Sequence, residues 1–381
     1  MKYKLKEIFD LQMGKTPARN NDKYWNSKDY KWISIADLTS TDKYINNTKE
    51  YISQSAVTES GIKIIPANTV VMSFKLSIGK TAILSEDMYS NEAIMAFHDK
   101  HVVELLPEYI YYLIKAKNWN GGSNRAVMGQ TLNKATLSEI EVDVHTIDEQ
   151  RKIVESLNLV GRIIYKRNTQ LSKLGDILRA RFVEMFGDPV SNTYGFVEAT
   201  LPELGEFGRG VSKHRPRNDP RLLGGIYPLI QTGDVANSEL YITSYNSTYS
   251  ELGLKQSKMW GKGTLCITIA ANIAKTAILG IDACFPDSIV GFNANEKTSN
   301  IFIHFWFSFF QEIIESQAPE SAQKNINLKV LSELRVIVPE KHRQDEFVEF
   351  INQVNKSKVE VQRALDEAQL LFDSLMQKYF G

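Results

Sequence analysis

The sequence of 381 residues predicts an α+β protein built as a pseudo-two-fold internal repeat. Two similar globular α/β domains are separated by two long helices, which we expect to form an antiparallel coiled coil. The first observation is a duplication: the stretches from Gln150 to Gly187 and from Gln344 to Gly381 have equal length and begin about 194 residues apart, half of the chain. The second is that both stretches carry a heptad pattern. The third is that the residues preceding each stretch align with one another.

The repeat divides the chain into four segments. The first globular domain is expected over 1–147 and the first long helix over 148–187. The second domain follows over 196–339, and the second helix over 341–381. Acidic residues at the start of each helix suit the helix dipole, and glycine followed by proline after Phe186 is a stop signal.

Each expected helix carries one apolar stripe with alternating steps of four and three residues. In the first helix the stripe comprises Ile153, Leu157, Val160, Ile164, Arg167, Leu171, Leu174, Leu178, Arg181 and Met185. In the second it comprises Phe347, Ile351, Val354, Lys358, Val361, Leu365, Ala368, Phe372, Leu375 and Tyr379. The polar members Arg167, Arg181 and Lys358 can fix register at a cost in stability. The simplest burial for both stripes is pairing between the two helices, with dimerisation through them as the alternative.

The globular domains share a frame but differ in their loops. The matching blocks are Lys80–Leu84 with Lys275–Leu279, Glu92–Phe97 with Asp287–Phe292, and Leu137–Ile140 with Leu331–Leu334. The divergent regions are 14–35 against 210–232 and 118–130 against 312–324. A common frame with different loops is what two binding domains with different ligands would need.

Composition restricts the setting and the partners. Apolar content of 43% and charged content of 24% are ordinary for a water-soluble globular protein. The two cysteines, Cys266 and Cys284, suggest no disulfide framework, so a reducing, cytoplasmic setting is expected. The longest apolar run, 301–310, is about half of the ~20 residues that a membrane span needs, and we interpret it as a buried helix. No membrane association is expected.

A net charge of zero argues against generic binding of polyanions, although it permits a local basic surface. One basic cluster is present, in which Asp219 is the only acid. It comprises Arg209, Lys213, Arg215, Arg217 and Arg221.

No enzymatic motif is complete. Gly14-Lys15-Thr16 and Gly79-Lys80-Thr81 resemble the end of a phosphate-binding loop, but phenylalanine stands where its first glycine is required. The aromatic tetrad of adenine methyltransferases, with its two prolines, does not occur. Pro286-Asp287 lacks the following acid-x-Lys element of nucleases. His98 and His101 have no third ligand nearby in the sequence, so neither a catalytic nor a metal site is expected.

An ordered series of short motifs resembles the specificity (DNA-recognition) subunit of type I restriction-modification systems. In the first half the series is Gly14–Arg19, Tyr24-Trp25, Lys31–Ile33, Met72–Lys75, Ile78–Ile83, Asn91–Ile94, Gln130–Asn133 and Glu149-Gln150. The second half repeats it with Gln323–Asn327 and Gln344. The resemblance covers essentially the whole chain and rests on motif order, duplication and heptads together. The second half departs from the series at 211–216, which replaces the Thr-Pro motif.

The resemblance implies a function without catalysis by this chain. Each domain would be a target recognition domain that reads one half of a bipartite site in double-stranded DNA. The chain would need no cofactor of its own. It would bind methyltransferase subunits, two of them given the repeat, and restriction-translocase subunits, with S-adenosylmethionine and ATP bound by those partners. Thirty-six helical residues span about 54 Å, a scale that suits two readers about one DNA turn of 34–36 Å, or somewhat more, apart.

The candidate DNA contacts are polar or cationic side chains of the divergent loops and of the hairpins beside them. Lys and Arg suit phosphates, whereas Arg, Lys, Asn, Gln and Ser can bind base edges. In the first half we predict Lys15, Thr16, Arg19, Ser73, Lys75, Lys80, Asn124, Arg125 and Gln130. In the second half we predict Arg209, Lys213, Arg215, Arg217, Asn272, Lys275, Gln323, Lys324 and Asn325. Trp32 and Trp260 are expected in the core. The alternative function is a non-catalytic protein–protein scaffold or an orphan recognition subunit.

Overall fold

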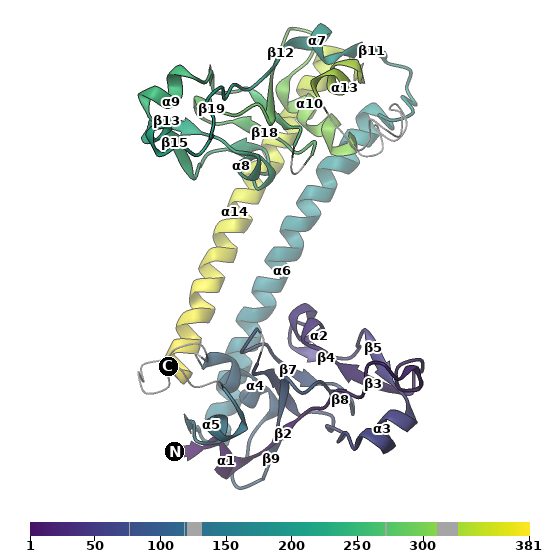
Figure 1. Cartoon of the computed structure of the whole chain (residues 1–381), viewed down its shortest axis with the longest axis vertical. Coiled ribbons are helices and arrows are strands. Elements are labelled where there is room, and N and C mark those ends of the chain that lie inside the picture. Colours follow the sequence, from purple (N-terminus) through teal and green to yellow (C-terminus); the bar gives the residue numbers. More distant parts are fainter. Residues whose placement is uncertain (76, 118, 120–131, 271–272, 311–326) are drawn as a thin grey trace. The chain divides into compact units, whose positions relative to one another are not determined.

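The computed structural model describes residues 1–75, 77–117, 119, 132–270, 273–310 and 327–381 (Figure 1). Two compact units account for it. Unit 1 consists of Met1–Asn168 and Arg363–Gly381, and unit 2 of Thr169–Gln362. Each unit therefore contains one globular domain, the N-terminal half of one long helix and the C-terminal half of the other.

Unit 1 is built around a five-stranded sheet with the order β2-β9-β6-β7-β4. Its strands are β2 (Phe9–Met13), β9 (Ile94–Asp99), β6 (Val70–Ser73), β7 (Thr81–Leu84) and β4 (Tyr44–Ile45). A second sheet joins β5 (Glu50–Ile52), β3 (Tyr30–Ile33) and β8 (Tyr89–Ser90), and β1 (Lys2–Lys4) pairs with β10 (Glu141–Asp143). The helices are α1 (Leu5–Ile8), α2 (Ile35–Ser40), α3 (Gln54–Ser60), α4 (Pro107–Ala116) and α5 (Lys134–Ser138), with a 3₁₀ turn η1 (Asp22–Tyr24).

Unit 2 repeats this plan, with the sheet order β12-β20-β17-β18-β14. The strands are β12 (Gly205–Arg209), β20 (Ile289–Ala294), β17 (Leu265–Thr268), β18 (Thr276–Leu279) and β14 (Tyr241–Ile242). Its second sheet joins β15 (Ser247–Tyr249), β13 (Leu223–Leu229), β19 (Ala283–Cys284) and β16 (Met259–Trp260), and β11 (Val197–Thr200) pairs with β21 (Arg335–Val338). The helices are α7 (Leu201–Leu204), α8 (Thr232–Ala236), α9 (Glu251–Lys255), α10 (Asn300–Trp306) and α13 (Leu328–Glu333), with 3₁₀ turns η3 (Pro220–Leu222) and η4 (Phe307–Phe309). The equivalent strand order confirms the predicted internal repeat.

The central strands are apolar at successive positions because both faces of the sheet are covered. In β6, Val70 and Met72 face the core that includes α4, whereas Val71 between them faces a second core that includes Leu38 of α2. Successive side chains of a strand point to opposite faces, so a strand covered on both sides needs a continuous apolar run.

The apolar run 301–310 forms α10 and the following 3₁₀ turn η4, both largely buried, as predicted. Trp306 is fully buried and packs in one core with Phe302. Within the part of the chain that the structure describes, no helix is both long and apolar enough to cross a bilayer.

The two long helices are α6 (Ile147–Phe186) and α14 (Lys341–Phe380). All twenty positions of the predicted heptad stripes are buried or half-buried, which confirms that the stripe is the inward face of each helix. Within unit 2, Arg343 Nη2 lies 2.6 Å from the carbonyl oxygen of Met185, and the Phe347 ring lies 5.4 Å from that of Phe182. Residue numbers rise along α14 as they fall along α6, so the helices run antiparallel there.

The ends of both long helices, outside the stripes as well as within them, continue into the domain cores. Phe182 of α6 packs 5.5 Å from Phe302 in unit 2. In unit 1, Phe380 at the end of α14 packs 5.5 Å from Tyr109 of α4. The helices are thus anchored in the domains as well as against each other, which the heptad pattern alone did not predict.

Two of the polar stripe members have partners in unit 2. Lys358 Nζ lies 2.8 Å from a carboxylate oxygen of Glu239, in the segment before β14. Arg181 pairs with Glu184 at 2.9 Å, and its guanidinium lies 5.7 Å from the Phe350 ring centroid. These positions therefore join each helix to the domain or to the other helix.

One buried glutamine at the start of each long helix ties the helix to its domain. Gln344 Nε2 donates to the carbonyls of Pro339 at 2.8 Å and Lys297 at 3.0 Å, and its Oε1 accepts from the Thr298 hydroxyl at 3.0 Å. Gln150 makes the equivalent contacts in unit 1: it donates to the carbonyls of His145 and Glu104 and accepts from the amide of Leu106. Both side chains are fully buried, so these bonds satisfy groups that water cannot reach.

We expect Gln344→Glu to lower the stability of the protein, because a carboxylate cannot donate to two buried carbonyls. Leaving buried acceptors unsatisfied costs roughly 1–3 kcal/mol per group. The measurement is the urea midpoint followed by tryptophan fluorescence. The matched control is Gln353→Glu, the same change at an exposed position of the same helix. Equal midpoints for the two variants would contradict the proposed role of Gln344.

Candidate functional site

In each unit one glycine brings the loop after the first sheet strand against the segment before β9 or β20. Gly14 N donates to the carbonyl of Ile94 at 3.1 Å, and Gly210 N donates to that of Ile289 at 2.9 Å. A Cβ on Gly14 would lie 2.2 Å from the nearest backbone oxygen, and one on Gly210 would lie 2.4 Å away. Only glycine allows this approach, so the two domains present their divergent loops from the same point of the same frame.

In unit 1 this approach gathers several predicted residues around Glu92. The Thr16 hydroxyl donates to the Glu92 carboxylate. That bond is the largest cause of a lowered pKa of the Glu92 carboxyl group. Burial opposes it, and the nearby cations of Lys75 and Arg19 lower the pKa further. Three of the predicted contacts therefore lie close to one acidic group that the sequence reasoning had not singled out.

Arg19 is held in place before any ligand binds. Its guanidinium pairs with both carboxylate oxygens of Glu50, with Nη2 at 3.1 Å from Oε2. It also lies 3.9 Å from the ring centroid of Trp25 and 4.8 Å from that of Trp32. Trp32 is fully buried and donates from its indole nitrogen to the carbonyl of Lys15 at 3.1 Å, so its predicted place in the core is confirmed.

The remaining described candidates of unit 1 are exposed, except for one that is buried. Lys75 and Lys80 are exposed, and Lys15 is exposed with its ammonium on the carbonyl of Ser60. Ser73, in contrast, is fully buried. Its hydroxyl donates to the carbonyl of Ser77 at 2.6 Å and accepts from the amide of Lys80 at 3.1 Å.

The burial of Ser73 favours a supporting role over the direct contact that we predicted. It holds the turn that carries Lys75 and Lys80. The equivalent residue of unit 2, Thr268, bonds both the amide and the carbonyl of Lys275 at 3.0 and 3.1 Å. The alignment of the two halves contained the signal, because a hydroxyl at the same frame position in both domains indicates architecture and not a divergent loop.

In unit 2 three arginines of the basic cluster pair with two carboxylates. Asp219 accepts from Arg221 Nη2 at 2.7 Å and lies 3.0 Å from His214 Nε2. Mainly because of Arg221, its pKa lies far below the usual range. The second carboxylate, Asp287, is brought in by the fold and pairs with Arg217 and, at 3.5 Å, with Arg215. Sequence reasoning missed it because it lies seventy residues away from Arg217.

The other described candidates of unit 2 are exposed: Arg209, Lys213 and Lys275. Trp260 is buried and stacks on Phe285 with ring centroids 5.0 Å apart, as expected for a core residue. The seven remaining candidates lie outside the described residues: Asn124, Arg125, Gln130, Asn272, Gln323, Lys324 and Asn325.

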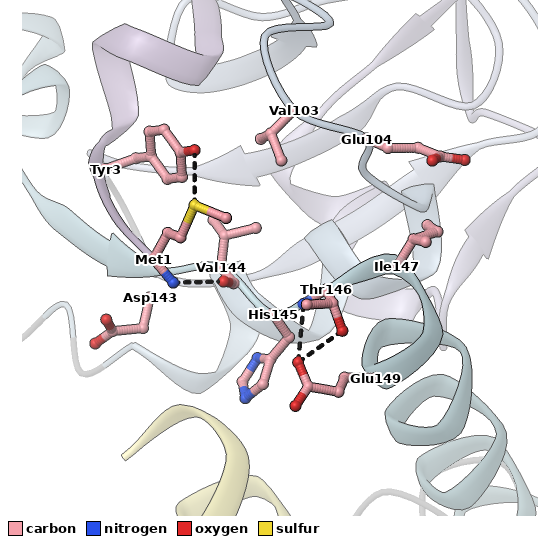
Figure 2. Close-up of a pocket in the computed structure, with 10 residues that line it drawn as sticks. All are labelled: Met1, Tyr3, Val103, Glu104, Asp143, Val144, His145, Thr146, Ile147 and Glu149. Carbon is pink, nitrogen blue, oxygen red and sulfur yellow. Dashed lines mark hydrogen bonds between the residues drawn. The ribbon is translucent and has the colours of Figure 1, made fainter.

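Unit 1 also has two recesses, and the predicted residues line neither. The first lies between β1, β10 and the start of α6, where Figure 2 shows Glu149 beside His145, and Glu104 and Asp143 among the other residues that line it. Three carboxylates make this recess unsuited to phosphate. The second lies between α4 and α6, where Lys43 Nζ bonds Glu108 at 2.5 Å and Asn158 at 2.7 Å and braces the domain against the helix. Among the described residues, no group of three His, Cys, Asp or Glu side chains could hold a metal ion.

Known proteins with similar sequences include specificity subunits of type I restriction enzymes. The chain is 29% identical over 189 residues to the type I restriction enzyme MjaIX specificity subunit of Methanocaldococcus jannaschii, which covers 49% of this chain and 43% of that protein. It is 28% identical over 165 residues to the type I restriction enzyme EcoR124I/EcoR124II specificity subunit of Escherichia coli. This second match covers 40% of this chain and 39% of that protein. The matches thus span less than half the length of these relatives.

Solved structures support the fold at low sequence identity. A chain from a study of complex assembly and conformational transition of the type I restriction-modification system superposes with a TM-score of 0.64 at 14% identity, covering 100% of this chain and 97% of that one. The S subunit of the type I system from M. genitalium gives a TM-score of 0.55 at 15% identity, covering 100% and 96%.

The family model of the type I restriction modification DNA specificity domain matches residues 1–173 and again 195–368. Each match contains one of the two domains that share a sheet order and a close backbone approach at a glycine, Gly14 or Gly210. The chain therefore belongs to the family of type I restriction-modification DNA specificity proteins and carries two of its domains.

Proposed function

We propose that this protein is the non-catalytic recognition subunit of a type I restriction-modification complex, in which each unit reads one half of a bipartite DNA target. The main observation behind this proposal is that the two units share one strand order but carry different polar side chains in their loops. Gly14 and Gly210 direct equivalent loops to the same place, but the carboxylate that follows on the frame is paired with a hydroxyl, Thr16, in unit 1 and with an arginine, Arg217, in unit 2. Different donors on one frame suit two different half-sites.

The available side chains match the requirements of duplex DNA. The exposed ammonium groups of Lys75, Lys80, Lys213 and Lys275 suit phosphates, whose contacts position a protein without reading sequence. The guanidinium of Arg217 offers donors that suit base edges, whereas the Thr16 hydroxyl, whose proton goes to Glu92, offers its oxygen as an acceptor. The two long helices, which are covalently continuous with both units, would set the spacer between the half-sites.

The same repeat suggests the partners. Two similar frames offer two similar docking surfaces, which fits a pair of adenine methyltransferase subunits together with restriction-translocase subunits. S-adenosylmethionine and ATP would be bound by those partners and not by this chain. A cytoplasmic location follows from a function on the host chromosome.

A protein–protein scaffold is the second candidate function, and exposed apolar side chains on the helices favour it. Leu159 and Tyr165 of α6 are 53% and 63% exposed, and Leu370 of α14 is 69% exposed. Such side chains suit a partner surface but would also be present in a recognition subunit. Competition of a labelled target with random duplexes separates the two functions, because a scaffold shows no sequence preference.

The isolated chain is expected to bind DNA weakly, because its net charge is zero and its cations are partly paired. The binding should weaken as salt rises, because contacts between cations and phosphates release counterions. Addition of methyltransferase subunits should raise the affinity by supplying charge and contact area. Gel-shift titrations between low and physiological salt test this expectation. Tight, salt-insensitive binding by the chain alone would contradict it.

Replacing Lys213 and Arg217 with alanine should damage recognition of only one half-site, because both residues belong to the loop of unit 2. The readout is the affinity of the complex for duplexes mutated in either half. Lys262→Ala with Lys329→Ala removes the same charge from exposed positions of the same unit and serves as the matched control. Equal damage at both half-sites would count against modular reading.

Deleting residues 161–167 of α6 together with residues 362–368 of α14 removes one heptad from each helix and preserves both stripes. The shortening is about 10 Å, which corresponds to about three base pairs at 3.4 Å each. We therefore expect the preferred spacer to shorten by about that number. The measurement is methylation of a set of targets with spacers of graded length. An unchanged spacer preference would refute the role of the helices as a ruler.

A further inference from the structure

Asp287 of unit 2 lies on a rigid part of the frame. It follows β19 and precedes β20, where the Ile289 amide donates to the carbonyl of Pro286 and the Ile269 amide donates to that of Ser288, both at 3.0 Å. The close approach of Gly210 to Phe285 and Pro286 brings the following loop against the same segment. A carboxylate at this point has a fixed position relative to the sheet, unlike a side chain on a loop tip.

The two arginines on Asp287 have different surroundings. Arg215 Nη1 donates to the carbonyls of Ser212 at 2.6 Å and His214 at 2.9 Å, while its Nη2 lies 3.5 Å from Asp287 Oδ2. The Arg215 guanidinium therefore stabilises the backbone of the loop to which it belongs. Arg217 gives one terminal nitrogen, Nη2, to Asp287 Oδ1.

The rest of the Arg217 guanidinium remains available. Its side chain is 47% exposed, and the structure shows no hydrogen bond from its Nε or Nη1 to any of the described residues. Arg217 is therefore anchored at one nitrogen and open at the others. A held arginine loses less rotamer freedom on binding than a free one, and its remaining donors point in a defined direction.

An oriented guanidinium has one preferred partner among the base edges. Guanine presents two acceptors, O6 and N7, in the major groove, and these match the paired donors of arginine. Lysine carries the same charge but lacks the planar pair of donors. Orientation, and not charge, would thus determine whether Arg217 reads a base or only attracts phosphate.

Unit 1 has a different arrangement at the equivalent position. Glu92 accepts from the Thr16 hydroxyl, and Arg19 is held elsewhere by both oxygens of Glu50. Among the described residues, an arginine paired with this carboxylate of the frame is thus found only in unit 2. The expected consequence concerns one half-site only.

We infer that Asp287 is a positioning residue that holds Arg217 to read a guanine in the half-site bound by unit 2. This inference rests on the proposed function. It adds the base that is recognised, guanine, the residue that recognises it, Arg217, and the residue that orients Arg217, Asp287.

The experiment uses the full chain assembled with its methyltransferase subunits and a library of duplexes randomised across both half-sites. Bound duplexes are sequenced for the wild type and for Asp287→Asn, Arg217→Lys and Glu206→Gln. We expect the wild type to enrich a bipartite motif with a guanine in one half. Asp287→Asn and Arg217→Lys should each reduce the preference for that guanine by roughly tenfold, within the range of a bidentate arginine–guanine contact, and leave the other half-site unchanged.

Glu206→Gln is the matched control, since it removes one negative charge from the same unit at an exposed carboxylate that pairs with Lys258 at 3.2 Å. It should retain the motif. The double variant Asp287→Asn with Arg217→Lys should lose no more preference than either single variant, because both changes remove the same contact.

Retention of the guanine preference by Asp287→Asn, with its loss in Arg217→Lys, would overturn the positioning role. Retention in both variants would overturn the reading of guanine as well. If Asp287→Asn prevents assembly, Asp287→Glu and Arg217→Lys decide: the inference requires the first to keep the preference and the second to lose it. A wild-type complex that enriches no bipartite motif would instead refute the proposed function itself.

Discussion

Burial of the two heptad stripes is the constraint on which the rest of this structure depends. A single helix of forty residues with one apolar stripe cannot keep that stripe in water. Here all twenty stripe positions are buried or half-buried, partly against the other helix and partly inside the domain cores. Each domain core is therefore completed by helix residues distant in sequence, such as Phe347 in unit 2 and Phe380 in unit 1. Neither globular domain has its full core without both long helices.

That constraint explains why the glutamines at the helix starts matter. Each unit must fix the point at which the chain enters a long helix, because an error there would be carried along the entire helix. Gln150 and Gln344 fix this point with bonds to equivalent groups in the two units. An amide side chain suits the task, since it donates and accepts without bringing a charge into the core.

The repeated frame fixes the position of the loops, and the divergent loops differ in the side chains that they expose. Gly14 and Gly210 set where the loops lie, and Ser73 and Thr268 hold the turns beside them. The loops then differ in what they present. A chain of zero net charge can still offer basic surfaces, but its cations are shared with carboxylates such as Glu50 and Asp287. Under the proposed function, these carboxylates would reduce indiscriminate attraction to phosphate and would orient the cations paired with them, which favours specificity over affinity.

The sequence by itself determined the repeat, the two long helices and their inward faces, because a duplication is visible when the chain is compared with itself and a heptad pattern follows from helix geometry alone. It also indicated the loop regions, and the exposure of Lys75, Lys213 and Lys275 agrees with their selection as candidate contacts. Only the tertiary structure decided the neighbours of those residues. Asp287 meets Arg217 across seventy residues, and Ser73 turns inward although its neighbour Lys75 turns outward. Contacts of this kind depend on how the strands are ordered in the sheet, and no local pattern encodes that order.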